Sequence, residues 1–206
     1  MRIYNLRSGA KMVRNNFKII FFDLETTGFN QFHNNIIEIA AKDNKNNEFH
    51  SLVDPEQSIS KKITSITNIT NSMVKGKPKI NTVLEDFIKF CFKDTKKNEN
   101  VYLVAHNGNA FDRVFLERKM FECCLDIPDW KYIDSLHLAQ YLLPNKYSHS
   151  LKNLCKHWNI IQKNAHRAMS DVEDLEKIFE LLIHTWEYNY GDTTIEEVCK
   201  FLSPKK

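Results

Sequence analysis

Two acidic residues stand close together at the end of an apolar run. The segment FFDLETTGF, residues 21–29, contains Asp23 and Glu25. Side chains alternate between the faces of a strand, so a strand here would present both carboxylates on one face and turn Leu24 toward the core. Like charges on one face repel each other unless a cation lies between them. No cysteine or histidine adjoins them, so a hard, oxygen-binding cation such as Mg²⁺ or Mn²⁺ fits this pair.

Chance is the alternative explanation, because the chain has 26 acidic residues. Two further acids bear on this choice. Asp112 follows the apolar run VYLVA within the segment HNGNAFD, and Asp171 follows Ser170 at the expected start of a helix. Acids are common at helix N-termini because they interact favourably with the helix dipole, which would explain either residue without a metal.

A histidine near the last of these acids is not explained by helix capping. His166 stands five residues before Asp171, in the expected loop ahead of the helix. A loop histidine beside a metal site can take a proton from water, which is the role of a general base. The residue types together therefore favour metal-assisted hydrolysis.

The apolar pattern predicts the elements that must position these residues. Strands are expected over residues 17–25, 35–42, 47–53, 101–106 and 130–134, and helices over residues 80–93, 111–123, 135–142, 150–158, 171–186 and 194–202. Residues 54–80 are expected to be irregular. The helix over 171–186 carries its apolar residues on one stripe, and Ser170 with Glu173 forms a capping box pattern. Strands followed by strands alternating with helices favour one α/β layer structure.

The N-terminal segment is basic. Residues 1–18 contain no acid but five basic side chains, which are Arg2, Arg7, Lys11, Arg14 and Lys18. Such a segment would suit contact with phosphates, and a solvated tail is the alternative. We expect a basic tail over 1–16, a catalytic domain over 17–186, and a short C-terminal helix or tail over 187–206.

Composition limits the classes of protein. A chain of 206 residues with 42% hydrophobic residues has room for one globular core. No apolar stretch approaches the roughly 18 residues that span a membrane, and the first residues lack the apolar segment of a secretory signal. The five cysteines show no CxxC spacing, which favours free thiols over a zinc site. These features predict an intracellular protein, cytoplasmic or nuclear, that is not secreted and has no membrane partner.

Four segments in order resemble the motifs of a known family. FDLETTG, AHNGNAFD, IDSL and AHRAMSD are similar to the motifs of the DEDDh (DnaQ-like) 3′–5′ exonucleases. The resemblance runs from about Phe17 to Ile183. It implies a ribonuclease H-like α/β fold, in which helices flank a central mixed five-stranded sheet made of an antiparallel meander plus parallel strands.

Two features of the motifs point to different branches of this family. His106 and Asp112 are six positions apart, a spacing that resembles the TREX-type branch of autonomous DNA exonucleases. The segment ETTGFNQ is closer to the polymerase III epsilon-type proofreading exonucleases. The sequence therefore leaves the subfamily open.

The resemblance also implies catalytic roles. It makes Asp23, Glu25, Asp112 and Asp171 the metal ligands and His166 the general base. In such sites two divalent ions, Mg²⁺ or Mn²⁺, lie about 4 Å apart and hold the scissile phosphate. A neutral imidazole accepts the proton, so activity should fall below the ordinary histidine pKa of about 6.5.

Residues after Glu25 are expected to contact substrate. The backbone of Thr26, Thr27 and Gly28 is suited to approach the terminal nucleotide, with Gly28 allowing a sharp turn. The resemblance further implies that Leu24 or a nearby apolar residue packs against the last base.

Aromatic and loop residues complete the predicted site. Phe29 and Phe32 could stack on bases. At least one of the two is nevertheless expected in the core, because aromatic residues are usually buried. His106 and Asn107 are expected to order the loop that holds Asp112.

These observations predict a metal-dependent 3′–5′ exonuclease that releases nucleoside 5′-monophosphates from a free 3′ end. Single-stranded DNA or a frayed DNA end is favoured over RNA as the substrate. An exoribonuclease on the same scaffold is the first alternative, because contacts to a 2′-hydroxyl cannot be located from the sequence. A nucleic-acid-binding module without activity is disfavoured, since all five catalytic residues are present. A polymerase partner and the oligomeric state stay open.

Overall fold

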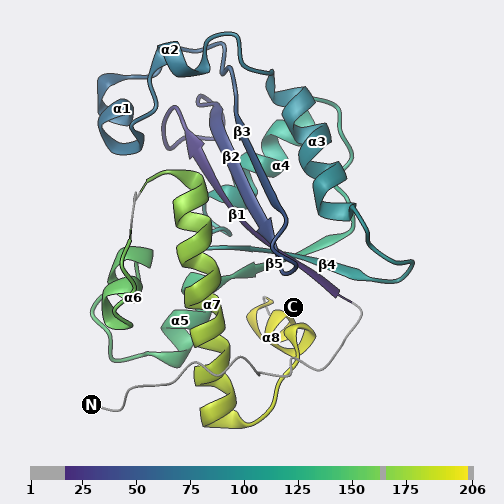
Figure 1. Cartoon of the computed structure of the whole chain (residues 1–206), viewed down its shortest axis with the longest axis vertical. Helices are drawn as coiled ribbons and strands as arrows, with labels where there is room; N and C mark the ends of the chain where they lie inside the picture. The colour runs from purple at the N-terminus through teal and green to yellow at the C-terminus, as the bar shows by residue number, and fades with distance from the viewer. Residues whose placement is uncertain (1–16, 163–165, 204–206) are drawn as a thin grey trace.

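A mixed sheet with the strand order β3-β2-β1-β4-β5 forms the centre of the chain (Figure 1). Its strands are β1 (Phe17–Thr26), β2 (Ile36–Asp43), β3 (Glu48–Leu52), β4 (Asn100–Ala105) and β5 (Trp130–Asp134). β1, β2 and β3 form an antiparallel meander, whereas β4 and β5 run parallel to β1. The structure is a computed structural model that describes residues 17–162 and 166–203, and it confirms the predicted sheet.

Helices cover both faces of this sheet (Figure 1). They are α1 (Lys61–Thr67), α2 (Asn71–Val74), α3 (Ile80–Phe92), α4 (Asp112–Glu122), α5 (Ser135–Leu142), α6 (Leu151–His157), α7 (Ala168–Tyr190) and α8 (Ile195–Leu202). Ile19 and Phe21 of β1 pack in one core with α5, α6, α7 and α8. Ile20 and Phe22 pack in a second core with α3 and α4. By the same alternation, Asp23 and Glu25 face α7, and Leu24 faces α3 and α4.

Two short helices lie in the segment that was expected to be irregular. The side chains of Ser60 and Thr70 cap α1 and α2 by accepting hydrogen bonds from backbone N–H groups. The buried faces of these helices join Ile37 of β2 in a small third cluster. The prediction of an irregular 54–80 segment was wrong because helices of one or two turns are too short to show a helical period.

Helix α7 begins earlier than its sequence pattern suggested. It starts at Ala168 after Arg167, so Ser170 lies within its first turn and the predicted capping box does not form. Instead, the Ala168 backbone N–H donates a hydrogen bond to Glu38 Oε2 at 3.0 Å. A cap supplied by a strand 130 residues away leaves no local signal in the sequence.

The C-terminal segment contributes to the same core. α7 continues to Tyr190, across the boundary expected at residue 186. The predicted last helix is confirmed as α8, which buries Ile195, Val198 and Cys199. These side chains belong to the core that α7 covers.

The five cysteines are free thiols in the structure. Within residues 17–162 and 166–203, no helix combines the length and the apolar character needed to cross a membrane.

Lys18 is a structural residue rather than part of a basic tail. Its ammonium group is buried and lies 3.4 Å from Asp43 Oδ2. It also donates hydrogen bonds to the backbone oxygens of Phe90 and Lys93, at 2.9 and 3.0 Å. The expectation that this lysine could contact phosphates was therefore wrong. The expected tail over 1–16, with Arg2, Arg7, Lys11 and Arg14, lies outside the described residues.

The buried ion pair gives a stability test. Replacement of Lys18 by Met should lower the free energy of unfolding by about 3 kcal/mol, because it leaves the buried Asp43 without its counter-charge. Urea denaturation measures this change. Lys89→Met is the matched control, since Lys89 pairs with Asp86 in solvent and its loss should leave the unfolding midpoint unchanged. Equal midpoints for both variants would contradict a structural role for Lys18.

Candidate active site

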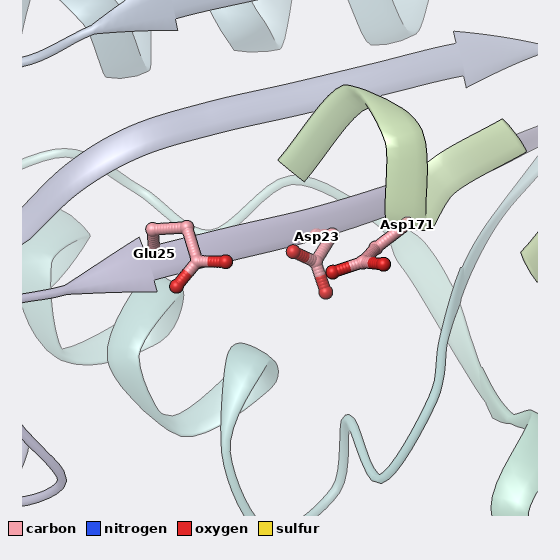
Figure 2. Close-up of side chains that lie close together, drawn as sticks. All are labelled: Asp23, Glu25 and Asp171. Atoms are coloured by element: carbon pink, nitrogen blue, oxygen red, sulfur yellow. The ribbon is translucent and has the colours of Figure 1, made fainter. Parts of the chain in front are cut away.

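Three carboxylates converge where β1 meets the start of α7. Each of Asp23, Glu25 and Asp171 offers one oxygen, and these oxygens all lie within 4.8 Å of one another. Figure 2 shows Asp23 and Glu25 on β1, with Asp171 reaching toward Asp23 from the helix. The strand period places the first two side chains on the face that α7 covers, and the early start of α7 brings the third to the same place.

Asp112 lies beside this cluster as the first residue of α4. It is 3% exposed. Its Oδ1 accepts a hydrogen bond from the Leu24 backbone N–H at 3.1 Å, which ties the start of α4 to β1 between Asp23 and Glu25. The negative charge of Asp112 raises the pKa of Asp23, so the two carboxylates interact. The four acids that the sequence selected are thus brought together, with three oxygens in one tight group.

Burial and mutual repulsion disfavour the charged forms of these acids. Burial, followed by the neighbouring carboxylates, raises the pKa of Asp23 well above its ordinary value and that of Glu25 to about 8. Burial also raises the pKa of Asp112 to about 7 and that of Asp171 to about 6. A divalent cation would relieve both costs, because it supplies positive charge and replaces the lost hydration. Oxygen ligands alone suit Mg²⁺ or Mn²⁺, so the residues present fit such ions.

His166 lies next to Asp171 with its side chain exposed. Its backbone N–H donates a hydrogen bond to Asp171 Oδ2 at 3.0 Å. Its φ of 63° is in the left-handed region, which histidine adopts more often than most residues. The hydrogen bond fixes the backbone beside the carboxylates and leaves the imidazole free to meet a solvent molecule.

Glu38 of β2 holds this segment and was not selected from the sequence. Its buried carboxylate accepts a hydrogen bond from Arg167 Nη2 at 2.8 Å, from the Ala168 N–H at 3.0 Å and from His50 Nε2 at 2.8 Å. Burial raises the pKa of Glu38, but the hydrogen bonds from His50, Arg167 and Ala168 outweigh it and hold the pKa at about 2. The available signal was an acid within the otherwise apolar run IIEIAA.

Asp134 at the end of β5 orders the loop before Asp112, and it too was given no role from the sequence. Its Oδ1 accepts hydrogen bonds from the N–H groups of Asn107 at 3.0 Å and Leu136 at 2.9 Å. Its Oδ2 accepts one from the Asn109 N–H at 3.0 Å. The signal was the motif IDSL, in which an acid ends a buried strand.

His106 anchors the same loop through both ring nitrogens. Nδ1 lies 2.9 Å from Ser135 Oγ, and Nε2 lies 2.9 Å from the His149 backbone oxygen. Burial lowers the pKa of His106, which favours the neutral imidazole. These contacts agree with a role in ordering the loop and leave neither ring nitrogen available to a substrate.

The segment after Glu25 is held by side chains of the neighbouring loops. Thr27 Oγ1 donates a hydrogen bond to Gln57 Oε1 at 2.6 Å, and Thr26 Oγ1 donates one to the Gly28 backbone oxygen. At Gly28, a Cβ atom would lie 2.6 Å from Asn34 Oδ1. Gly28 lies in the bend after β1, as expected, and the close approach of Asn34 leaves little room there for a side chain.

The three side chains predicted to contact bases differ in exposure. Leu24 is buried in the core with α3 and α4, so its side chain has no surface with which to meet a base, and that part of the expectation is corrected. Phe29 and Phe32 are 69% and 61% exposed. The expectation that at least one of them is in the core was wrong, because both lie on the loop between β1 and β2.

The comparisons with known proteins agree with this geometry. The RNase T exonuclease family model matches residues 20–179. The PolC-type DNA polymerase III of Clostridium perfringens is 36% identical over 165 residues, which cover 78% of this chain and 11% of that protein. Exonuclease DPD1 of Arabidopsis thaliana, described as chloroplastic/mitochondrial, is 35% identical over 194 residues, which cover 86% of this chain and 60% of that protein. The chain thus spans less than two thirds of the length of these relatives.

Solved structures share the fold. Escherichia coli exonuclease I in complex with a dT13 oligonucleotide aligns with a TM-score of 0.71 and 19% identity, over 84% of this chain and 42% of that one. Exonuclease X in complex with 5′-overhanging duplex DNA aligns with a TM-score of 0.65 and 25% identity, over 90% of this chain and 99% of that one. The family match covers most of the sheet and the carboxylate cluster. The chain belongs to the DEDDh family of 3′–5′ exonucleases, within the ribonuclease H-like superfamily.

Proposed function

We propose that this chain hydrolyses phosphodiester bonds from the free 3′ end of a nucleic acid and releases nucleoside 5′-monophosphates. The observation that carries this proposal is the group of oxygens from Asp23, Glu25 and Asp171 within 4.8 Å. Asp112 lies beside that group, and the His166 backbone N–H is hydrogen-bonded to Asp171. An inactive binding module would not need to hold these half-buried acids together against their repulsion.

The four carboxylates would hold two divalent cations, Mg²⁺ or Mn²⁺. Bound there, such ions lower the pKa of water and neutralise charge that develops on the phosphate and the leaving oxygen. The acids provide the negative charge and the oxygen ligands. Thr26 and Thr27 are buried and the Thr27 N–H donates to the Asn35 backbone oxygen at 2.8 Å, so this segment would approach the terminal nucleotide through the half-buried Gly28. Phe29, exposed on the same loop, would stack on the terminal base.

His166 would act as the general base. Its imidazole is exposed beside Asp171, where it can accept a proton from the attacking water. Glu38 fixes Arg167 and the first residue of α7, and it thereby limits the movement of the adjacent histidine. His106, with both ring nitrogens engaged, is not available for this role.

DNA is the preferred substrate class in this proposal. Several relatives are named as DNA polymerases of the PolC type, and two solved neighbours were determined with DNA. Single strands or frayed ends would fit a centre that receives one terminal nucleotide. An exoribonuclease is the second candidate, since a 2′-hydroxyl is sensed by a few local contacts. A polymerase is a candidate partner because the PolC-type relatives carry the matching region within a polymerase chain. We place this activity inside the cell.

The substrate can be tested with 5′-labelled single-stranded DNA and RNA of one sequence. With Mg²⁺ or Mn²⁺, we expect a ladder that shortens from the 3′ end, faster on DNA. EDTA should abolish it, and Asp23→Asn should slow it at least about 100-fold, because metal stabilisation of the transition state is worth several kcal/mol. Gel electrophoresis measures the rates. Faster shortening of RNA would select the exoribonuclease, and no ladder on either strand would reject the nuclease proposal.

The role of His166 as general base can be tested separately from metal binding by the carboxylates. His166→Asn should lower kcat by about 10²- to 10⁴-fold, the usual contribution of a general base. It should leave unchanged the rise in Tm that Mg²⁺ produces, since the imidazole binds no ion in this proposal. Asp171→Asn is the contrasting variant and should lose both activity and part of the Mg²⁺-dependent rise. Near-normal kcat in His166→Asn would assign the base to another group.

The raised carboxyl pKa values predict how the stability of the metal-free protein depends on pH. The folded protein retains protons at Glu25, Asp112 and Asp171 that the unfolded chain has lost, so stability in EDTA should fall as pH rises from about 5 to about 8. Glu38, with a pKa of about 2, stays ionised over this range and adds no slope. Mg²⁺ should therefore raise Tm more at pH 8 than at pH 5.

Thermal unfolding with and without Mg²⁺ measures both effects. Glu25→Gln is the control, because an amide does not titrate and the fall with pH should become shallower. The same slope in Glu25→Gln and in the parent protein would show that Glu25 ionises normally in the folded state.

A further inference from the structure

One face of α4 leads away from the start of the helix, half-buried along most of its length and exposed at Phe121. Phe111, Val114, Arg118 and Phe121 recur at intervals of three and four residues, so they share one side of the helix. Phe121, near the end of α4, is 72% exposed. At about 1.5 Å per residue, it lies about 14 Å along the helix axis from Asp112.

The loop between β1 and β2 lies along this face. The ring of Phe29 is 6.3 Å from that of Phe111, near the start of α4. Farther along, the Arg118 guanidinium lies 5.2 Å from the ring centroid of Phe32 and 5.6 Å from that of Phe121. Arg118 thus joins two exposed rings that come from different segments of the chain.

Arg118 is held in place and its charge is largely balanced. Its Nε donates a hydrogen bond to Glu122 Oε1 at 2.7 Å, one helical turn away. A carboxylate at this position would oppose close contact with a phosphate. Planar stacking of the guanidinium is compatible with it, because stacking uses the face of the group and not its edge.

Neither ring is explained by packing in the protein. Phe32 and Phe121 keep 61% and 72% of their surface in contact with solvent. Clustered apolar groups of this kind mark binding surfaces. The face begins at Phe111, whose ring contacts Phe29 of the loop that would receive the terminal nucleotide, and this continuity favours nucleic acid over a protein as its ligand.

We propose that Phe32, Arg118 and Phe121 form a stacking platform for bases of a single strand on the 5′ side of the cleavage site. This platform rests on the proposed exonuclease function and adds where the rest of the substrate lies. A length of about 14 Å along α4 corresponds to about four stacked nucleotides at about 3.4 Å each. Stacking is tolerant of sequence, because every base has a π-face. The platform would favour single strands over duplexes, whose bases are already paired and stacked.

Fluorescence anisotropy with a labelled 12-nucleotide oligothymidylate tests the platform directly. Ca²⁺ replaces Mg²⁺, since the carboxylates can bind it through oxygen. Phe121→Ala and Arg118→Ala should each raise Kd about 5- to 100-fold, the range for loss of a stacked base. Arg118→Lys should weaken binding nearly as much as Arg118→Ala, because lysine keeps the charge but has no planar group.

Tyr188→Ala is the matched control. Tyr188 is 91% exposed on the last turns of α7, far along that helix from Asp171, and its removal should not change Kd. Equal Kd for the parent and the platform variants would overturn the proposal and would assign the exposed rings to a protein contact. Parent-like binding by Arg118→Lys would also overturn it, because charge and not stacking would then be the attraction.

A minimal substrate separates failure of the platform from failure of the nuclease proposal. The p-nitrophenyl ester of thymidine 5′-monophosphate occupies only the catalytic centre. Parent and platform variants should hydrolyse it with equal kcat/KM in Mg²⁺ or Mn²⁺, while the variants show a raised KM on the 12-nucleotide strand. Loss of ester hydrolysis in the variants would place these residues in the catalytic centre and overturn the platform. Failure of the parent on both substrates would reject the nuclease, and anisotropy would still decide the platform.

Discussion

Repulsion among carboxylates is the constraint on which the site depends. Asp23 and Glu25 share a face of β1 because of the strand period, and Asp171 joins them from α7. Burial first, and neighbouring acids second, raise the pKa values of these three carboxyls, so their charged forms are held at an electrostatic cost. Burial in the two cores and the interstrand hydrogen bonds must offset that cost.

Two buried acids outside the cluster hold in place the backbone segments from which Asp171 and Asp112 extend. Glu38 fixes Arg167 and the start of α7, and Asp134 fixes the loop that precedes α4. Both accept several hydrogen bonds from backbone N–H groups or neighbouring side chains, and at Glu38 these bonds hold the pKa of the buried carboxyl low. Acids inside this domain therefore have two separate uses. The carboxylates of the cluster have no positive charge between them and are suited to bind a cation. Glu38 and Asp134 already accept hydrogen bonds and hold the backbone in place.

The sequence was sufficient for those features that depend on local period and on motif order. The strands, six of the helices and the convergence of the acids follow from alternation in β1 and from the motifs FDLETTG, AHNGNAFD and AHRAMSD. The sequence was insufficient where a residue far away along the chain determines where a helix starts or whether a side chain is buried. The start of α7 depends on Glu38, and the burial of Lys18 depends on Asp43. Phe32 is 61% exposed, with Arg118 beside its ring. Hydrophobicity alone would have buried that phenylalanine.

The division between buried and exposed groups has a consequence for specificity. In the proposed mechanism the acids and the histidine would act on phosphate or water, and neither role involves a base edge. Recognition of sequence would require hydrogen bonds to those edges. The side chains that could reach the bases are aromatic rings and a stacked guanidinium, which contact faces instead of edges. With this arrangement, the proposed exonuclease would remove whichever nucleotide is at the end, and its selectivity would come from whether a strand can separate and reach the centre.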